Sequence, residues 1–478
     1  MRVCVVVNGL GEERAALASY VLRTLLGTMG LSLSPRRADG LLVSYGCPIP
    51  ADGAGVEIAC GDPPTPEEAI QVHRRVTSEG PSLLVAEGPR VRVTADLVGA
   101  AGLWLAGGEE RAEGFDAFGR ACGAASPRAA AGLLRTPMVH DLMSLLCAAL
   151  SRAAEAAGLS LSRVPAWPEG RKFAVLLSHD VDLWRKRTAR QLAKETVKSL
   201  ARPWRLPGVA RAFCCGPDPW SDLDAIADLE GRYGMHSTFF ALPGRPNRVV
   251  DGVGVVNSYG ARAGAVGEAL RRLVARGWEV GLHGSFDSYR STEALAGERR
   301  DVAALLGVTS SFATSRQVRN EDVTLVTGCR QHFLRFERPV TWRAQAEAGL
   351  RYDATLGYHD TDGYRAGFSF PFRPFAGEEL LLLELPLAVM DGALLERQGL
   401  DAEAAWGLVE GYLKRTEADG AMLGLLWHNN YFCDLDAPGY RGVYERALGW
   451  TRDHGGWGAS AREIAEWWER RAALLQEG

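Results

Sequence analysis

A short apolar run that ends in two carboxylates constrains this chain more than any other feature. Residues 173–177 are all apolar, and residues 178–182 read Ser-His-Asp-Val-Asp. An apolar run of this length, bounded by charge, predicts a buried strand. Because strand side chains alternate between two faces, Asp180 and Asp182 are expected on one side and His179 on the other.

The two carboxylates allow two interpretations. Like charges side by side at a buried strand end repel, so Asp180 and Asp182 could share a metal, a proton or a cation. Alternatively, they could cap the next segment or pair with Arg185 and Arg187. Taken alone, the pattern favours neither interpretation.

Strands and helices alternate from residue 172 onward. The predicted strands are 173–177, 237–241 and 278–282, and the predicted helices are 221–233, 266–276 and, near the end of the chain, 462–475. Such alternation favours βα units in a parallel sheet or barrel, where chemistry gathers at the carboxyl ends of the strands. The basic amphipathic stretch 188–213 interrupts the pattern. It could contact an anionic ligand, but a solvated helical insertion is the simpler interpretation.

The region before this alternation, residues 1–165, is predicted to form a smaller α+β domain. Its expected elements are a strand at 3–7, Gly9-Leu10-Gly11, a helix at 12–29, strand-like pieces at 41–44 and 56–59 with a more apolar stretch at 97–105, and a helix at 138–157. Pro165 and Pro168 mark a linker, so the second domain is expected over 170–478.

Composition narrows the functional classes. The 478 residues are 47% hydrophobic and 23% charged, with a net charge of −4, which indicates neither a nucleic-acid binder nor a polybasic membrane anchor. The nine cysteines include no C-x-x-C pair, and no secretory signal pattern opens the chain. No apolar run reaches the ~18–20 residues of a membrane helix. A soluble cytoplasmic protein is expected.

A second polar cluster follows the predicted strand 278–282. His283 and Asp287 are four residues apart, so a helical turn starting there would place both on one face, about 6 Å apart. An imidazole and a carboxylate at this spacing form a usual half of a divalent metal site, whereas a His–Asp hydrogen bond closing a loop is the simpler alternative. Combined with the aspartates of a neighbouring strand, the metal interpretation is favoured.

Several segments, in order, resemble the motifs of the polysaccharide deacetylase family (NodB-homology, carbohydrate esterase 4-type). They are 178–182 (Ser-His-Asp-Val-Asp), 236–240 (His-Ser-Thr-Phe-Phe), 279–285 (Glu-Val-Gly-Leu-His-Gly-Ser), 328–332 (Gly-Cys-Arg-Gln-His), 351–358 (Arg-Tyr-Asp-Ala-Thr-Leu-Gly-Tyr) and 425–428 (Leu-Leu-Trp-His). The resemblance covers residue 172 to the end and implies an α/β fold, a distorted (β/α) barrel of about seven strands. The preceding region loosely resembles a domain found in some cytoplasmic members, expected to cover part of the barrel or help bind substrate.

The resemblance also implies a mechanism. The implied metal ligands are Asp182, His283 and Asp287. Asp180 would be the general base that activates a water, with Arg330 holding its position. His428 would protonate the departing amine. The implied cofactor is a divalent metal, zinc in the first place, which would activate the water and polarise the N-acetyl carbonyl.

Two departures from the family pattern bear on these roles. Val181 separates the usually adjacent aspartates, so Asp180 and Asp182 could exchange base and ligand roles. Asp287 stands where the family usually has histidine, which gives a harder ligand set that would tolerate manganese, iron or magnesium better. A site without metal, as in the related allantoinase-like enzymes, is an alternative.

Four further residues are candidate substrate contacts: Arg373, Trp427, Tyr358 and His332. Arg373 lies among phenylalanines and prolines and suits a carboxylate or phosphate, although a structural salt bridge is an equal alternative. The resemblance implies an N-acetylated sugar, glycan or glycan precursor as substrate. A small amide, or binding without turnover by a catalytically silent carbohydrate-binding barrel, are the alternatives. His359 and His454 are assigned to the surface.

Overall fold

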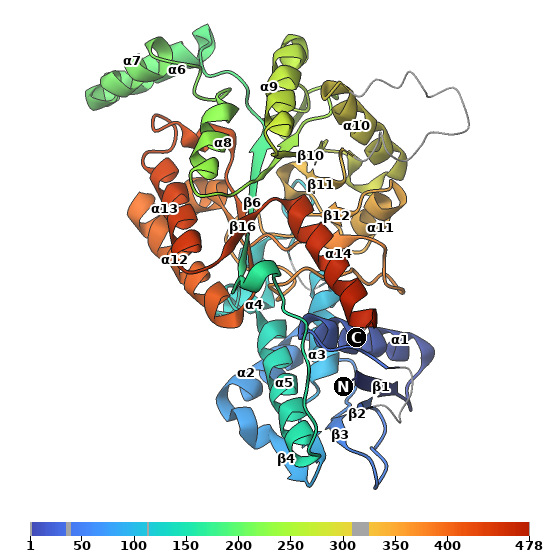
Figure 1. Ribbon diagram of the computed structural model, residues 1–478. Helices are drawn as coiled ribbons and strands as arrows, with labels where there is room; N and C mark the ends of the chain where they lie inside the picture. Colours follow the sequence, from blue (N-terminus) through green and yellow to red (C-terminus); the bar gives the residue numbers. More distant parts are fainter. Residues whose placement is uncertain (1, 35–39, 112–113, 308–324, 478) are drawn as a thin grey trace.

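The computed structural model describes residues 2–34, 40–111, 114–307 and 325–477. Two separate sheets organise them, and both ends of the described chain lie beside the first sheet (Figure 1). All strands of the first sheet precede residue 165, and all strands of the second follow residue 170. Among the described residues, no helix is long and apolar enough to cross a membrane.

The first sheet has five strands in the order β1-β2-β3-β5-β4. They are β1 (Arg2–Val7), β2 (Gly40–Tyr45), β3 (Gly55–Ile58), β4 (Leu84–Glu87) and β5 (Arg90–Val93), parallel except for the β4–β5 hairpin. Its helices are α1 (Glu12–Thr28), α2 (Pro66–Glu79), α3 (Leu97–Leu105), α4 (Pro127–Ala130) and α5 (Met138–Ala156). The apolar stretch 97–105, grouped with strand-like pieces in the sequence, is the helix α3. Asp96 begins this helix by accepting a hydrogen bond from the Gly99 N–H at 2.7 Å.

The second sheet is parallel and has the order β13-β12-β11-β10-β7-β6-β15-β14, with β16 also paired to β6. Its strands are β6 (Ala174–Val181), β7 (Thr238–Ala241), β10 (Glu279–Gly284), β11 (Gly328–Gln331), β12 (Tyr352–Asp353), β13 (Leu383–Glu384), β14 (Val389–Met390), β15 (Met422–Leu426) and β16 (Trp457–Ala459). A separate hairpin joins β8 (Arg248–Val250) to β9 (Val253–Val255). All eight residues of β6 are buried, as expected for a central parallel strand.

The prediction of a distorted (β/α) barrel is confirmed. The curled sheet has eight strands along its main path instead of about seven, and β13 and β14 are its two ends. The surrounding helices are α8 (Leu223–Gly231), α9 (Ala263–Ala275), α10 (Thr292–Leu305), α11 (Val340–Glu347), α12 (Ala402–Asp419), α13 (Tyr440–Asp453) and α14 (Ala461–Glu477). Because every strand of this sheet runs the same way, the side chains that follow the strands meet at one end of the barrel.

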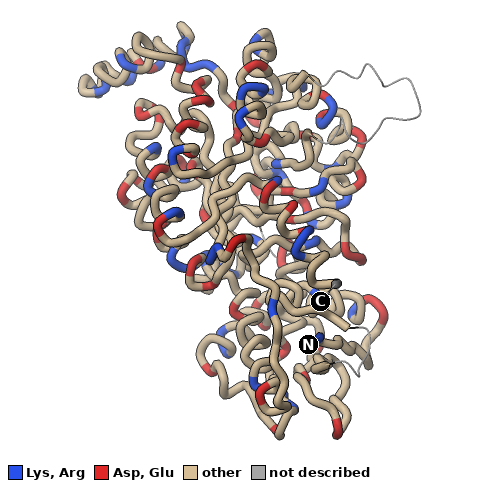
Figure 2. Tube along the Cα trace, viewed as in Figure 1, with Lys and Arg blue, Asp and Glu red and all other residues tan. Residues whose placement is uncertain are grey.

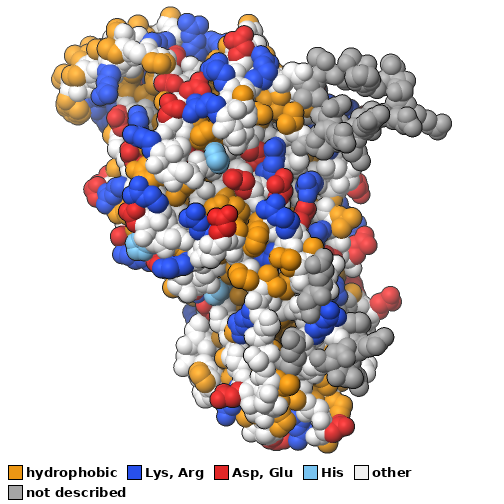
Figure 3. Space-filling view, viewed as in Figure 1, with side chains coloured by type: hydrophobic (Ala, Val, Ile, Leu, Met, Phe, Trp, Pro, Cys, Tyr) orange, Lys and Arg blue, Asp and Glu red, His pale blue; other side chains and the backbone are white. Residues whose placement is uncertain are grey.

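Two helices project from the barrel and form an arm, defined here as residues 189–214 (Figure 1). The sequence predicts one helix here, but Pro203 separates α6 (Ala189–Ala201) from α7 (Leu206–Cys214). Figure 2 shows Lys and Arg positions along the arm, and Figure 3 shows hydrophobic side chains on its surface.

Buried ion pairs join the N-terminal region to the barrel. Arg338, from the barrel, donates to Glu110 Oε1 at 2.8 Å and to Glu109 Oε1 at 2.8 Å, both from the N-terminal region. Arg365 also pairs with Glu110. Burial alone would raise the pKa of Glu110, but the charges of Arg338 and Arg365 outweigh it, so the pKa is lowered.

The last helix adds a second connection. Arg471 of α14 donates to the carbonyl oxygens of Pro165 at 2.8 Å, Gly27 at 2.9 Å and Thr28 at 3.0 Å. One buried guanidinium thereby satisfies the carbonyls at the end of α1 and in the linker.

Replacing Arg338 with alanine should destabilise the protein by about 3–5 kcal/mol, because two buried carboxylates each lose one of their cationic partners. Urea unfolding measures this change. Arg75→Ala is the matched control, since the Arg75–Glu79 pair is half-exposed, with side-chain exposures of 47% and 43%. Its loss should cost less than about 0.5 kcal/mol. Equal effects of the two substitutions would contradict a role for the buried pairs in joining the domains.

Candidate functional site

Polar side chains converge at the carboxyl end of the barrel strands. Asp180 is the second-last residue of the strand β6 and Asp182 lies directly after the strand. His283 lies on β10, and His428 follows β15 by two residues. The alternation expected for β6 is confirmed, because His179 points the other way. There its Nδ1 donates to the Trp427 carbonyl at 2.6 Å and its Nε2 lies 2.8 Å from Glu230.

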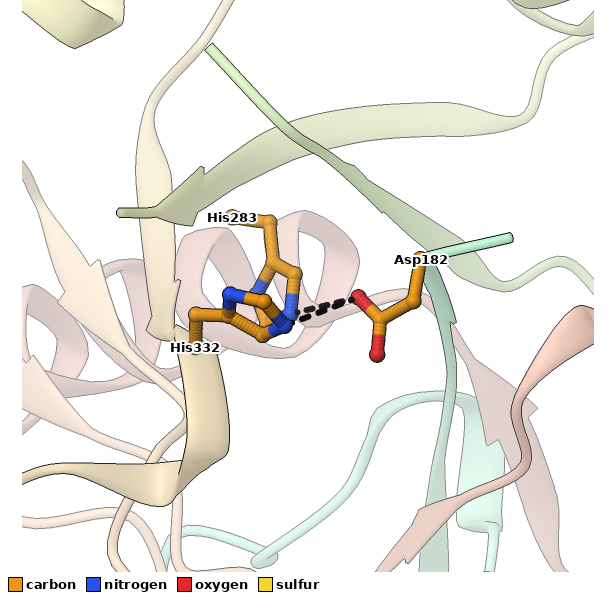
Figure 4. A group of neighbouring side chains, drawn as sticks. All are labelled: Asp182, His283 and His332. Carbon is orange, nitrogen blue, oxygen red and sulfur yellow. Dashed lines mark ion pairs between the residues drawn. The ribbon is translucent and has the colours of Figure 1, made fainter. Parts of the chain in front are cut away.

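Asp182, His283 and His332 form a group that could hold a metal ion, called the metal-type group below (Figure 4). One ligand atom from each lies within 4.8 Å of the others. Asp182 Oδ1 is 3.1 Å from His283 Nε2 and 3.6 Å from His332 Nε2, so both rings aim the same nitrogen at one carboxylate oxygen. One carboxylate and two imidazoles are a common donor set for zinc.

The hydrogen bonds of this group fit a metal ion. His283 Nδ1 lies 2.9 Å from the Arg330 carbonyl, which can only accept, so Nδ1 carries a proton and the lone pair of the neutral form of the ring is at Nε2. Among the described residues, the buried atoms His283 Nε2 and Asp182 Oδ1 make no hydrogen bond. Two buried ligand atoms facing each other without a hydrogen bond are what a bound cation would satisfy.

The side chains of the group shift one another's pKa values. Burial would raise the pKa of Asp182, but the facing rings of His332 and His283 hold it well below its usual value. Burial also opposes protonation of His283, yet Asp180 and Asp182 raise the pKa of that ring. At His332, burial prevails and lowers the pKa.

Asp180 occupies a different position from Asp182. Its Oδ1 accepts a hydrogen bond from Arg330 Nη1 at 3.2 Å, and the same nitrogen reaches Ser178 Oγ at 2.9 Å. Arg330 is fully buried and is fixed further by the Ala354 carbonyl, 2.9 Å from its Nε. The Oδ2 of Asp180 lies 3.6 Å from His283 Nε2, so this carboxylate adjoins the metal-type group with one oxygen already held.

His428 faces both aspartates from the opposite side. Its Nε2 is 3.7 Å from Asp182 Oδ2 and 4.0 Å from Asp180 Oδ2. Its Nδ1 lies 2.7 Å from Asp391 Oδ1, and Asp391 also accepts the backbone N–H of His428. Burial disfavours the charged ring, but Asp391 and then the two other aspartates raise the His428 pKa to about 10.

These groups open into a cavity of about 290 Å³. Its wall includes Asp180, Asp182, His283, His332 and His428, with Tyr431, Met390 and Leu334 as larger neutral side chains. Arg120 and His359 lie in the same wall. Arg120 comes from the N-terminal region, so that region contributes to the cavity.

The structure does not bring Asp287 into the group, which corrects the predicted ligand set. The predicted helical turn does not start at His283, because β10 continues to Gly284, and four-residue spacing therefore does not place the two side chains on one face. Asp287 has a half-exposed side chain that pairs with Arg248 and lies 3.6 Å from Arg335 Nη1. His332, predicted only as a substrate contact, lies beside Asp182 and His283 in its place.

The other predicted substrate contacts lie outside the wall of this cavity. Arg373 borders a separate groove near α1 and α14, where its Nε is 3.9 Å from Glu379. Tyr358 is buried and its hydroxyl accepts a hydrogen bond from Arg128 at 2.7 Å. Trp427 is fully buried against Tyr440 and Tyr444. These positions differ from the predicted roles.

Two site residues are not found by sequence reasoning. Asp391 contacts His428 across 37 positions, and the sequence around it gives no signal of that pairing. His359 is buried and lies 3.3 Å from Asp116, although the sequence assigns it to the surface. The turn that presents His332 is also unexpected, because Phe333 and Leu334 adopt φ values of 62° and 53° that non-glycine residues rarely use.

Comparison with protein-family models and with curated proteins gives no match. Among solved structures, the chain is similar to a putative polysaccharide deacetylase from Mycobacterium smegmatis, with 18% identity, a TM-score of 0.42 and coverage of 64% of this chain and 95% of that one. Polysaccharide deacetylases are among the structures that this chain resembles.

Two further solved structures are similar to about the same share of this chain. The PuuE allantoinase has 15% identity and a TM-score of 0.41, with 65% of this chain and 95% of that one covered. The peptidoglycan deacetylase PdaC from Bacillus subtilis has 15% identity and a TM-score of 0.32, with coverage of 64% and 97%. At these identities and scores, conclusions about chemistry rest on the site itself.

Replacing His332 or Asp182 with alanine should weaken zinc binding by on the order of a hundredfold or more, because each removes one of three ligand atoms. Asp287→Ala should leave zinc binding within about threefold, since its carboxylate contacts arginines instead. Calorimetric titration of zinc into the metal-stripped proteins measures all three. Loss of binding in Asp287→Ala with retention in His332→Ala would restore the ligand set predicted from the sequence.

Proposed function

We propose that this protein is a metal-dependent hydrolase that removes the acetyl group from an N-acetylated sugar, glycan or glycan precursor. The observation that carries the proposal is the position of Asp180. Its carboxylate is fixed by Arg330, adjoins the Asp182–His283–His332 group, and faces His428 across the same cavity. A base, a metal-type group and an acid around one cavity are what amide hydrolysis requires.

Asp182, His283 and His332 would hold the ion. When bound, it would supply Lewis acidity for the amide carbonyl and make water a better nucleophile at neutral pH. The Asp/His/His set is closer to the usual zinc sites than the Asp/His/Asp set expected from the sequence, which makes zinc the first choice.

Asp180 would take the proton of the attacking water. Its Oδ1 is held by Arg330 at 3.2 Å, which leaves Oδ2 directed toward the cavity beside His283. A base held in one orientation loses little entropy when the reaction begins. Arg330 acts as a positioning residue, because its guanidinium contacts Asp180 and Ser178 and does not line the cavity.

His428 would give a proton to the departing nitrogen. The Asp391 carboxylate accepts from Nδ1 and so directs the other ring nitrogen, Nε2, into the cavity. Water adds to the acetyl carbon, the carbon–nitrogen bond breaks, and the proton from His428 completes the free amine while acetate leaves. The volume of about 290 Å³ lies near the lower end of the ~300–1,000 Å³ typical of ligand pockets, which suits one sugar unit.

Asp180→Asn should lower the rate of acetate release by about a hundredfold to ten-thousandfold while zinc binding is retained, since the amide cannot accept the proton. Acetate release from N-acetylglucosamine oligosaccharides and from N-acetylglucosamine 1-phosphate, together with zinc titration, provides both readouts. Asp287→Asn is the matched control and should retain the rate of the unmodified protein.

Two outcomes would contradict the proposal. Equal acetate release before and after removal of the metal would favour a metal-free amidohydrolase acting on a small amide. Zinc binding without turnover of any acetylated sugar or amide would favour a carbohydrate-binding barrel.

Asp391→Asn should lower kcat by about tenfold to a hundredfold with little change in KM, because it weakens the hydrogen bond that orients His428 and does not remove a ligand. Zinc binding should be unchanged, which separates this effect from damage to the metal group. A rise in KM at constant kcat would contradict an action through His428.

A further inference from the structure

The arm and the four residues that precede it carry an unusual concentration of positive charge. Residues 185–214 contain nine Lys or Arg side chains and one carboxylate, Glu195, a formal charge of +8 in a chain whose net charge is −4. Glu195 is buried at the base of the arm, where it pairs with Lys186, Lys198 and Arg205. The carboxylate is therefore turned toward the protein. Of the remaining cations, Arg187 donates to backbone carbonyls in 212–217, and the other five are exposed.

The helix α6 is inverted relative to an ordinary surface helix. Its buried side chains are the polar Glu195 and Ser199, whereas Leu192, Val197 and Leu200 are exposed. Surface helices normally turn the apolar face inward and the polar face to water. The apolar face of α6 therefore has no partner among the described residues.

The exposed apolar side chains continue past the helix. Leu200 is 81% exposed, Trp204 74% and Leu206 54%. Together with Leu192 and Val197, they make five of the thirteen large exposed hydrophobic side chains of the described chain, all within the 26-residue arm. Figure 3 shows hydrophobic and basic side chains together on this projection. A concentration of this kind marks an interaction surface.

A cationic groove lies at the foot of the arm. It has a volume of about 760 Å³, begins at Asp182, and runs between α6 and the segment 247–262. The cations in its wall are Arg185, Arg190, Lys194 and Arg262. None of these four makes an ion pair with another described residue. Arg190 and Lys194 are four positions apart on α6 and so form a stripe beside its exposed apolar face.

Exposed apolar side chains also lie on the opposite side of the groove. The β8–β9 hairpin exposes Val249 to 74% and Val253 to 42%, and the neighbouring residues Asn247 and Val256 line the groove. Exposed apolar side chains therefore lie on both elements that border the cationic groove, α6 and the β8–β9 hairpin, and the groove reaches the metal-type group at Asp182.

We propose that the arm and the β8–β9 hairpin dock the protein onto the surface of an anionic lipid bilayer. The apolar side chains would enter the region between headgroups and acyl chains, and the unpaired cations beside them would contact lipid phosphates. Charge complementarity selects this partner, since the surface combines leucine, valine and tryptophan with cations and has its carboxylate turned inward. The arm lies along such a surface and does not span it.

Docking in this way gives the site an orientation. Asp182 lines both the groove and the catalytic cavity, so the metal-type group would open toward the bilayer. On the basis of the proposed function, the substrate is then an acetylated amino sugar joined to a lipid through phosphate, with the phosphate in the groove. Lipid binding itself needs no turnover, so it is tested separately from that function.

Co-sedimentation of the full chain with vesicles tests the docking surface. The protein should bind vesicles of mixed phosphatidylcholine and phosphatidylglycerol and not vesicles of phosphatidylcholine alone, and binding should weaken as salt increases. The double substitution Leu200→Ser and Trp204→Ser should weaken binding on the order of a hundredfold, and Arg190→Gln with Lys194→Gln roughly thirtyfold.

Leu381→Ser is the matched control, because Leu381 is 84% exposed outside the arm and the hairpin. It should bind vesicles as the unmodified protein does, and all variants should keep its thermal stability since the changed side chains are exposed. No vesicle binding by the unmodified protein would overturn the proposal. So would arm substitutions that leave vesicle binding intact but abolish a dimer seen by light scattering, which would assign the surface to a second copy of the chain.

Discussion

The burial of two carboxylates at the end of one strand is the constraint on which this site depends. Asp180 and Asp182 lie at the end of a strand whose eight residues are all buried, where uncompensated charge is costly. Two strands further along the same sheet, β10 and β11, bring countercharges to the same end of the barrel. β11 supplies Arg330 to Asp180, and β10 and the turn after β11 supply imidazoles to Asp182. The parallel order of the strands makes this convergence possible.

Much of the arrangement could be predicted from the sequence, and the failures have physical causes. Strand periodicity separated Asp180 from His179, and the order of the motifs brought His283, Arg330 and His428 to the same end of the barrel. The predicted position of Asp287 was wrong because it assumed that a helical turn starts at His283, where the strand continues. Asp391 could not be found, because its role depends on a contact between segments far apart in the chain.

The net charge of the whole chain also gave no indication of a strongly basic segment. The net charge of −4 suggested no attraction to anionic surfaces, yet residues 185–214 carry +8. The amphipathic pattern of this stretch was visible in the sequence, but not the direction of its apolar face. That direction is set by tertiary contacts: Glu195 pairs with Lys186 and Arg205 at the base, and these ion pairs turn the polar face inward.

The end of the chain has a structural consequence for the whole molecule. Arg471 of the last helix satisfies carbonyls at the end of the first helix and in the linker, about as far apart in sequence as two segments of this chain can be. This contact brings the last helix of the barrel against the first helix of the N-terminal region. The barrel expressed without its first 165 residues would lose these acceptors and would expose the surface around Arg471 to water. The last helix of the chain therefore holds the N-terminal region against the barrel.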